Sequence, residues 1–222
     1  MNAVVSELQD VSIIDFLNNG SGRTVLLTGI SWAEYEKFLN AFWEKTNLSL
    51  AYDNGRLEIM PKSQKHEDYS RSVYNLLLAY CEYFDIKLES RGSATFKQEF
   101  AKKGVEPDEC FYIQTADKII GRKISAKDFP APDVAVEIDL TTESLDKFPI
   151  YAALKVPEVW IYDGKTVSFY ELEAENYRRI SHSRALPKLE AEKLAEFLEI
   201  SRTSGQTFAL KSFRAWLRLE DK

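Results

Sequence analysis

The chain has 222 residues, of which 45% are hydrophobic and 29% are charged, the balance of an ordinary globular protein. Its formal net charge of −6 argues against a surface coated with basic residues for nucleic acid, and without an apolar run of about 18 residues we expect no membrane span. The first residues lack the basic segment of a signal peptide, and Cys81 and Cys110 form no CxxC pair. We therefore expect a cytoplasmic protein with two free thiols and no structural zinc site.

The first predicted elements are a helix and a hairpin. Residues 31–39 (SWAEYEKFL) begin with the capping box Ser31–Glu34 and continue with aromatic residues at helical spacing. Residues 48–60 (LSLAYDNGRLEIM) read as two strands, and the pair Asn54-Gly55 between them favours a tight turn with positive φ angles. This region therefore predicts a helix followed by two antiparallel strands.

The longest predicted helix covers residues 63–84, where an apolar stripe runs from Val73 to Phe84. Its N-cap is either Ser63 or Asp68. Several predicted strands follow this helix in the sequence, and further predicted helices lie nearer the C-terminal end. The predicted strands cover residues 86–90, 93–100, 106–113, 132–140 and 157–172. The last of these ranges is a hairpin that turns at Asp163-Gly164. The predicted helices cover residues 147–155, 186–200 and 207–220.

This order of elements predicts an α+β or mixed α/β fold in which helices flank a central mixed sheet. The strand at 132–140, the helix at 147–155 and the next strand fit a βαβ crossover, so we expect those strands to be parallel neighbours. No repeat or long linker divides the chain. We expect an N-terminal extension at residues 1–30, one domain at residues 31–200 and a C-terminal helix at residues 201–222 that packs on the domain or on a partner.

Acidic residues alternate with other residues along two predicted strands. One strand has Glu106 and Asp108 on a single face, and the other has Asp133, Glu137 and Asp139 opposite its apolar residues. If the strands are neighbours, these carboxylates meet at one end of the sheet, where a hard cation such as Mg²⁺ or Mn²⁺ would relieve their repulsion. Lys147, at the start of the next helix, can extend to the same end. Such a set suits metal-assisted hydrolysis of a phosphodiester.

The same pattern has a purely structural explanation. Alternating acids are also typical of a strand with one solvent-exposed face, and Lys147 is then an ordinary surface lysine. Spacing distinguishes the acids from one another. Asp133 and Glu137 are roughly 13 Å apart at ~3.3 Å per residue, too far to share an ion, whereas Glu137 and Asp139 are roughly 6–7 Å apart. Asp108 is therefore a better partner for Glu137 than Asp133 is.

Three segments, at residues 63–77, 102–113 and 132–164, resemble the Uma2 family, also called DUF820. The resemblance covers roughly residues 30 to 200. It implies a restriction endonuclease with the PD-(D/E)xK nuclease fold, that is, a mixed α/β fold with a restriction-endonuclease-like core. It matches Asp108 to the acid of the first metal-binding strand and Glu137 to the acid of the ExK element.

The chain departs from the wider superfamily two residues after Glu137, where Asp139 replaces the usual lysine. In sequences similar to Uma2, a lysine four residues before a tyrosine takes its place, and here these are Lys147 and Tyr151. Asp139 is then an additional metal ligand or a neighbour of the ligands. Supporting positions implied by the resemblance or by the acidic pattern are His66, Glu67 and Asp133.

Residues and resemblance together predict a Mg²⁺- or Mn²⁺-dependent DNA endonuclease, with DNA as its partner and a homodimer as an open option. Asp108 and Glu137, with Asp139, would hold the metal, and Lys147 would orient or activate the water. The alternative is a catalytically silent nuclease fold that binds nucleic acid or protein, which the net acidity favours. A glycoside hydrolase with two carboxylates is a third hypothesis, which the lysine disfavours.

Overall fold

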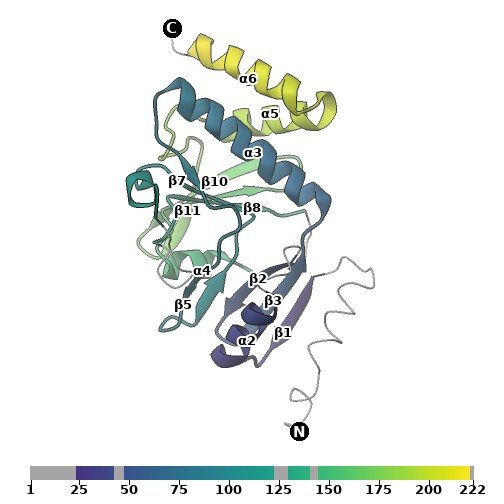
Figure 1. Ribbon diagram of the computed structural model, residues 1–222, viewed down its shortest axis with the longest axis vertical. Coiled ribbons are helices and arrows are strands. Elements are labelled where there is room, and N and C mark those ends of the chain that lie inside the picture. The colour runs from purple at the N-terminus through teal and green to yellow at the C-terminus, as the bar shows by residue number, and fades with distance from the viewer. Residues whose placement is uncertain (1–23, 43–47, 123–129, 141–144, 221–222) are drawn as a thin grey trace.

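A computed structural model describes residues 24–42, 48–122, 130–140 and 145–220 (Figure 1). Its strands form two sheets, one of five strands and one of six, and the helices flank them. The predicted fold class, a mixed α/β fold with helices around the β structure, is confirmed. The division of the strands into two sheets is a feature that the sequence pattern did not indicate.

The five-stranded sheet is built around the predicted hairpin. Its strands follow the order β1-β3-β2-β6-β5, and their pairing is antiparallel. The turn between β2 and β3 is formed by Asn54-Gly55, both with positive φ, which confirms the predicted turn. The strands are β1 (Val25–Thr28), β2 (Leu48–Asp53), β3 (Arg56–Pro61), β5 (Phe96–Gln98) and β6 (Lys103–Val105).

Helix α2 (Trp32–Phe42) packs on this sheet, and its predicted capping box is confirmed. Glu34 Oε2 accepts hydrogen bonds from the Ser31 N–H at 2.7 Å and from the Ser31 hydroxyl at 2.6 Å. Tyr35 stacks on a tyrosine of β2, and its hydroxyl lies against Gly104 in β6. A Cβ at Gly104 would overlap that hydroxyl, so the close approach requires glycine.

The six-stranded sheet follows the order β11-β10-β9-β8-β7-β4. β8 and β9 pair in parallel, as the predicted crossover requires, and β7 lies next to β8, so the two acidic segments are neighbours. β11 was not predicted. The strands are β4 (Glu89–Ser90), β7 (Glu109–Tyr112), β8 (Val134–Ile138), β9 (Glu158–Tyr162), β10 (Val167–Glu173) and β11 (Asn176–Ile180).

Helices cover both faces of this sheet. The long helix α3 (Gln64–Tyr83) begins at Ser63, one of its two predicted caps, and packs with α5 (Ala191–Ser204) and α6 (Gln206–Glu220) on one face (Figure 1). Helix α4 (Phe148–Ala153) lies on the other face, and a 3-10 turn, η2 (Ala116–Lys118), follows β7. Of the helices in the described ranges, none is long and apolar enough to cross a membrane.

The two faces of β8 pack against different layers. Val134, Val136 and Ile138 face the core beneath α3, α5 and α6. Ala135 belongs to a second core that includes α4 and residues of the five-stranded sheet. Because side chains alternate along a strand, Glu137 shares the face of Ala135. Its carboxylate is therefore buried between the layers, and the acidic face of β8 is not the solvent-exposed face that we considered as an alternative.

Candidate active site

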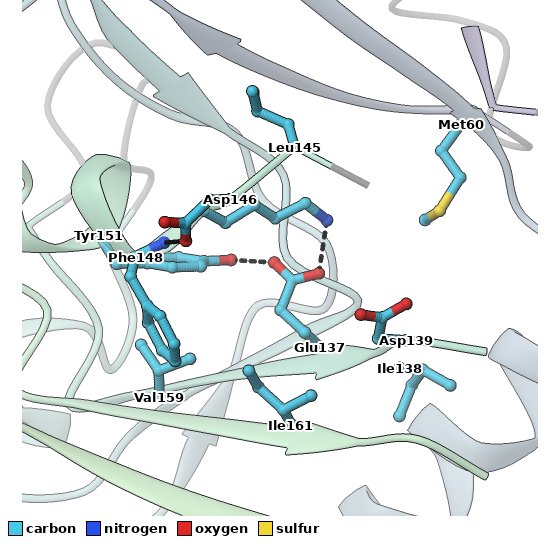
Figure 2. A pocket seen from close by; sticks show the side chains of 11 residues that line it. Met60, Glu137, Ile138, Asp139, Leu145, Asp146, Phe148, Tyr151, Val159 and Ile161 are labelled. Carbon is cyan, nitrogen blue, oxygen red and sulfur yellow. Dashed lines mark hydrogen bonds and ion pairs between the residues drawn. The ribbon is translucent and has the colours of Figure 1, made fainter. Parts of the chain in front are cut away.

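Glu137, in β8, is the centre of a hydrogen-bonded cluster (Figure 2). Its Oε2 lies 2.7 Å from Lys147 Nζ, and its Oε1 accepts a hydrogen bond from the Tyr151 hydroxyl. Glu137 is 6% exposed and Tyr151 is fully buried. Each carboxylate oxygen thus has its own donor, in a place where bulk water has little access.

Helix α4 supplies both donors. Lys147 is the N-cap of this helix, and Pro149 lies in its first turn, where the missing N–H costs no helical hydrogen bond. Residues four apart share a helix face, so Tyr151 lies one turn beyond Lys147 on the same side. The lysine–tyrosine spacing noted in the sequence therefore directs two side chains to one carboxylate.

Asp108 lies beside Glu137 on the neighbouring segment. Its N–H donates to the Val136 carbonyl at 3.0 Å, and its Oδ2 accepts from the Ile138 N–H at 2.8 Å. These two contacts lie on either side of Glu137 in β8, so the carboxyl groups of Asp108 and Glu137 are close neighbours. Asp108 Oδ1 is also 3.8 Å from Lys62 Nζ. The structure therefore brings Asp108, Glu137 and Lys147 together, as the sequence pattern predicted.

Two further charged residues belong to the cluster and were not predicted. Glu58, in β3, is 2% exposed; its Oε1 lies 3.8 Å from Lys147 Nζ and its Oε2 accepts from the Leu145 N–H at 2.5 Å. Lys62 follows the same strand, and its side chain is 4% exposed. The available signal was Glu58 itself, a single acid between apolar neighbours in a predicted strand. Without knowledge of the second sheet, that signal could not be connected to Glu137.

The cluster contains three buried carboxylates, Glu58, Asp108 and Glu137, and two lysines, Lys62 with a buried side chain and Lys147 with a partly buried one. With every group ionised, the carboxylates exceed the lysines by one, so one negative charge is left over. Buried charges of one sign are unfavourable unless a counter-charge lies among them. The cluster therefore has the character of a site that accepts a cation.

Burial and neighbouring charges shift the pKa values of this cluster. Burial raises the pKa of Glu137, Lys147 opposes the rise, and the Asp108 carboxylate adds to it. Burial alone would lower the pKa of Lys147, but Glu137, Glu58 and Asp108 outweigh it and raise that pKa above its ordinary value. Burial and the contact with Glu137 also raise the pKa of Tyr151. At neutral pH, Lys147 is therefore an ammonium group and Tyr151 a neutral donor.

The other two predicted acids of the strand differ in their surroundings. Asp139 lines the same cavity as Glu137 (Figure 2). Asp133 Oδ2 instead accepts hydrogen bonds from the N–H groups of Ile113 and Thr115, at 2.7 and 2.9 Å, and from the Thr115 hydroxyl at 2.9 Å. Asp133 thus holds the turn that follows β7, and the structure does not bring it into the cluster.

The two predicted supporting residues on α3, His66 and Glu67, have different surroundings. His66 is buried and completes the capping box of α3, because its Nδ1 accepts from the Ser63 N–H at 3.3 Å. Glu67 is exposed and lines a second cavity together with Asp108. The structure therefore gives His66 a role in starting the helix and places Glu67 at the edge of the site.

The donor set can be compared with the requirements of a divalent ion. Among the residues that the structure describes, no group of three or more Asp, Glu, His or Cys side chains is arranged to hold a metal. Mg²⁺, however, keeps several waters and is commonly bound through only one or two carboxylates together with substrate phosphates. The adjacent carboxylates of Asp108 and Glu137 fit that mode of binding.

A cavity of about 220 Å³ opens next to the cluster (Figure 2). Its polar wall consists of Glu137, Asp139, Asp146 and Lys147. Most of the remaining lining is apolar and comes from Met60, Ile138, Leu145, Phe148, Val159 and Ile161. A group that enters this cavity would meet Glu137 and Lys147 together.

A family model described as "Putative restriction endonuclease", Uma2, matches residues 32–203. The chain belongs to the Uma2 family. A crystal structure from Anabaena variabilis ATCC 29413, described as "a putative nuclease belonging to DUF820", is similar at 15% sequence identity and a TM-score of 0.48; the match covers 76% of this chain and 90% of that one. A comparison with curated proteins finds no match. Membership of the Uma2 family supports a nuclease.

Proposed function

We propose that this Uma2 protein is a metal-dependent DNA endonuclease that hydrolyses phosphodiester bonds. The observation that carries the proposal is the contact between Glu137 and Lys147 beside Asp108, buried between two sheets. Two carboxylates and one ammonium group suit metal-assisted phosphodiester hydrolysis, because the carboxylates can hold the ion and the ammonium group can stabilise developing negative charge. The Uma2 match over residues 32–203 supports the same reaction class.

Asp108 and Glu137 would hold Mg²⁺ or Mn²⁺, and a bound ion of this kind lowers the pKa of its water and polarises a phosphoryl oxygen. Lys147 would donate hydrogen bonds to the attacking water or to a phosphate oxygen, and so stabilise the charge that develops there. Tyr151 holds Glu137 in place through its hydroxyl, and the carboxylates around Lys147 keep it protonated. Asp139, which lines the same cavity as Glu137, would support the same ion.

Cleavage assays test this assignment. Purified protein is incubated with supercoiled plasmid and with single-stranded DNA in Mg²⁺, in Mn²⁺ and in EDTA. We expect cleavage only with a divalent ion, and loss of cleavage in Glu137→Gln and Asp108→Asn. Glu196→Gln is the matched control, because it makes the same change at an exposed residue of α5. Cleavage that Glu137→Gln leaves unchanged would contradict the site assignment.

A catalytically silent nuclease fold is the second candidate. The observation in its favour is that Lys147 already neutralises Glu137, while the chain as a whole carries a net charge of −6. Calorimetric titration with Mn²⁺ separates the two candidates. An active site should bind Mn²⁺ and lose that binding in Asp108→Asn, whereas a silent module should bind no ion or bind it equally well in the variant.

A further inference from the structure

A second cavity, of about 530 Å³, is lined in part by Asp108 and by neither Glu137 nor Lys147. It is an open hollow, lined by residues of the first half of α3, of β4 with the turn that follows it, and of the start of β7. Its volume falls within the roughly 300–1,000 Å³ of small-molecule sites. Because Asp108 belongs both to this cavity and to the charged cluster, a ligand here would lie next to the candidate metal site.

The wall formed by α3 is polar. Glu67, Arg71 and Asn75 are four residues apart in turn and so share one face of the helix, with Tyr74 beside them. Within the described part of the chain, the side chains of Glu67, Arg71 and Asn75 form no hydrogen bond or ion pair. The apolar stripe of α3 packs on the sheet, whereas Glu67 and Arg71 are exposed and Asn75 is partly buried. This polar face borders the cavity, so its side chains are available to a ligand.

The charges of the lining indicate which part of a DNA strand fits. Glu67, Asp108 and Glu109 contribute three carboxyl groups, against one cation from Arg71. Such a balance disfavours a phosphate group as the occupant. A nucleobase is uncharged and carries N–H donors and carbonyl or ring-nitrogen acceptors, which carboxylate and amide side chains recognise. Tyr74 and Arg71 also supply planar groups of the kind on which unpaired bases stack.

We propose that this cavity binds one unpaired nucleobase of the DNA strand whose neighbouring phosphate lies at Asp108. The assignment rests on the proposed nuclease function and extends it to the form of the substrate. A base inside a duplex would have to leave the stack to enter, whereas a base in a single strand or a mismatch is already accessible. The protein should therefore prefer single-stranded or locally unpaired DNA to intact duplex.

Binding measurements with matched DNA probes test the proposal. Fluorescence anisotropy is recorded in Ca²⁺ with a labelled single strand of about 12 nucleotides, its duplex, and an abasic strand of equal length that keeps the phosphates. The single strand should bind roughly tenfold more tightly than the abasic strand and more tightly than the duplex. Asn75→Leu and Arg71→Ala should remove this base-dependent difference, and Asn75→Leu should leave abasic binding unchanged. Gln64→Leu is the control. Like Asn75→Leu, it replaces an amide side chain of α3 by leucine, but at an exposed residue outside the cavity.

The outcomes separate this proposal from the one on which it rests. Equal binding of the normal and abasic strands, or a base-dependent difference that survives in both cavity variants, overturns the cavity assignment and leaves metal-dependent cleavage untouched. Base-dependent binding without metal-dependent cleavage supports the cavity assignment and contradicts the nuclease function. Binding of none of the three probes overturns the cavity assignment, and the cleavage assay then decides the nuclease function by itself.

Discussion

Lys147 Nζ and Glu137 Oε2 lie 2.7 Å apart, although the two residues are ten positions apart in the chain and belong to different elements. Glu137 is part of β8, and Lys147 caps the helix that crosses from β8 to β9. The predicted βαβ crossover is therefore also what brings the lysine to the acid. The residue two positions after Glu137 is Asp139, so the lysine that contacts Glu137 comes from the helix and not from the strand.

Replacement of Lys147 tests how much of the reaction depends on its charge. We expect Lys147→Met to lower single-turnover cleavage roughly 10²- to 10³-fold, the usual cost of removing one donor at developing charge. The variant also leaves Glu137 buried without its cation, so the free energy of unfolding should fall by about 3 kcal/mol in urea titrations. Lys65→Met, at an exposed residue of α3, should change neither value, and cleavage retained in Lys147→Met would contradict the catalytic role.

The Tyr151 hydroxyl should act by positioning Glu137. Tyr151→Phe removes the hydrogen bond to Glu137 and little volume, so we expect a loss of about 1.5–3 kcal/mol in stability, the range for hydrogen bonds to charged groups. If Tyr151 positions the metal-holding carboxylate, the Mn²⁺ affinity should fall as well, which a purely structural hydroxyl would not change. Tyr170→Phe is the matched control, because the ring of Tyr170 packs on Phe148 beside the same helix. Unchanged Mn²⁺ affinity in Tyr151→Phe would limit its role to folding.

The sequence predicted the parts of the fold that depend on local chemistry. The Ser31–Glu34 capping box, the Asn54-Gly55 turn and the parallel β8–β9 pair all followed from short-range patterns, and all are confirmed. β11 was missed because its sequence, NYRRI, is a polar edge strand with little alternation. The division into two sheets depends on contacts between distant segments, on which local patterns carry no information.

Prediction of the candidate site from local sequence patterns was limited in the same way. Asp108, Glu137 and Lys147 could be predicted because β7, β8 and the crossover helix are close in sequence and match a family pattern. Glu58 and Lys62 come from the other sheet, so no spacing rule could place them beside Lys147. Asp133 is the opposite case: it is a conspicuous acid in the pattern, its spacing already separated it from Glu137, and in the structure it stabilises a turn.

Asp53 should make the hairpin of the five-stranded sheet sensitive to acid. Burial alone would raise the pKa of Asp53, but hydrogen bonds from Lys103 and Arg56 outweigh it and lower that pKa below its usual value. A lowered pKa gives stability that is present above the unfolded-state pKa of about 3.9 and is lost as the pH falls through the folded-state pKa. Asp53→Asn should therefore destabilise the protein at pH 7, and the difference from wild type should shrink below about pH 4.

Chemical denaturation of Asp53→Asn at several pH values checks this expectation. Asp117→Asn is the matched control, because Asp117 pairs with Lys87 at an exposed surface site where ion pairs contribute little. A difference between Asp53→Asn and wild type that stays constant from pH 7 to about pH 3 would show that the carboxylate charge does not stabilise the hairpin.

Cys81 and Cys110 should be unreactive in the folded protein. Both are buried, and burial raises the pKa of each thiol to about 12. The thiolate is the reactive form, so at pH 8 the folded protein should react only very slowly with a thiol reagent such as Ellman's reagent. In urea both thiols should become accessible and react together, because each is released only when its core unfolds. Fast labelling of either thiol without denaturant would indicate local opening of the core around it, and the Cys81→Ala and Cys110→Ala variants would show which one opens.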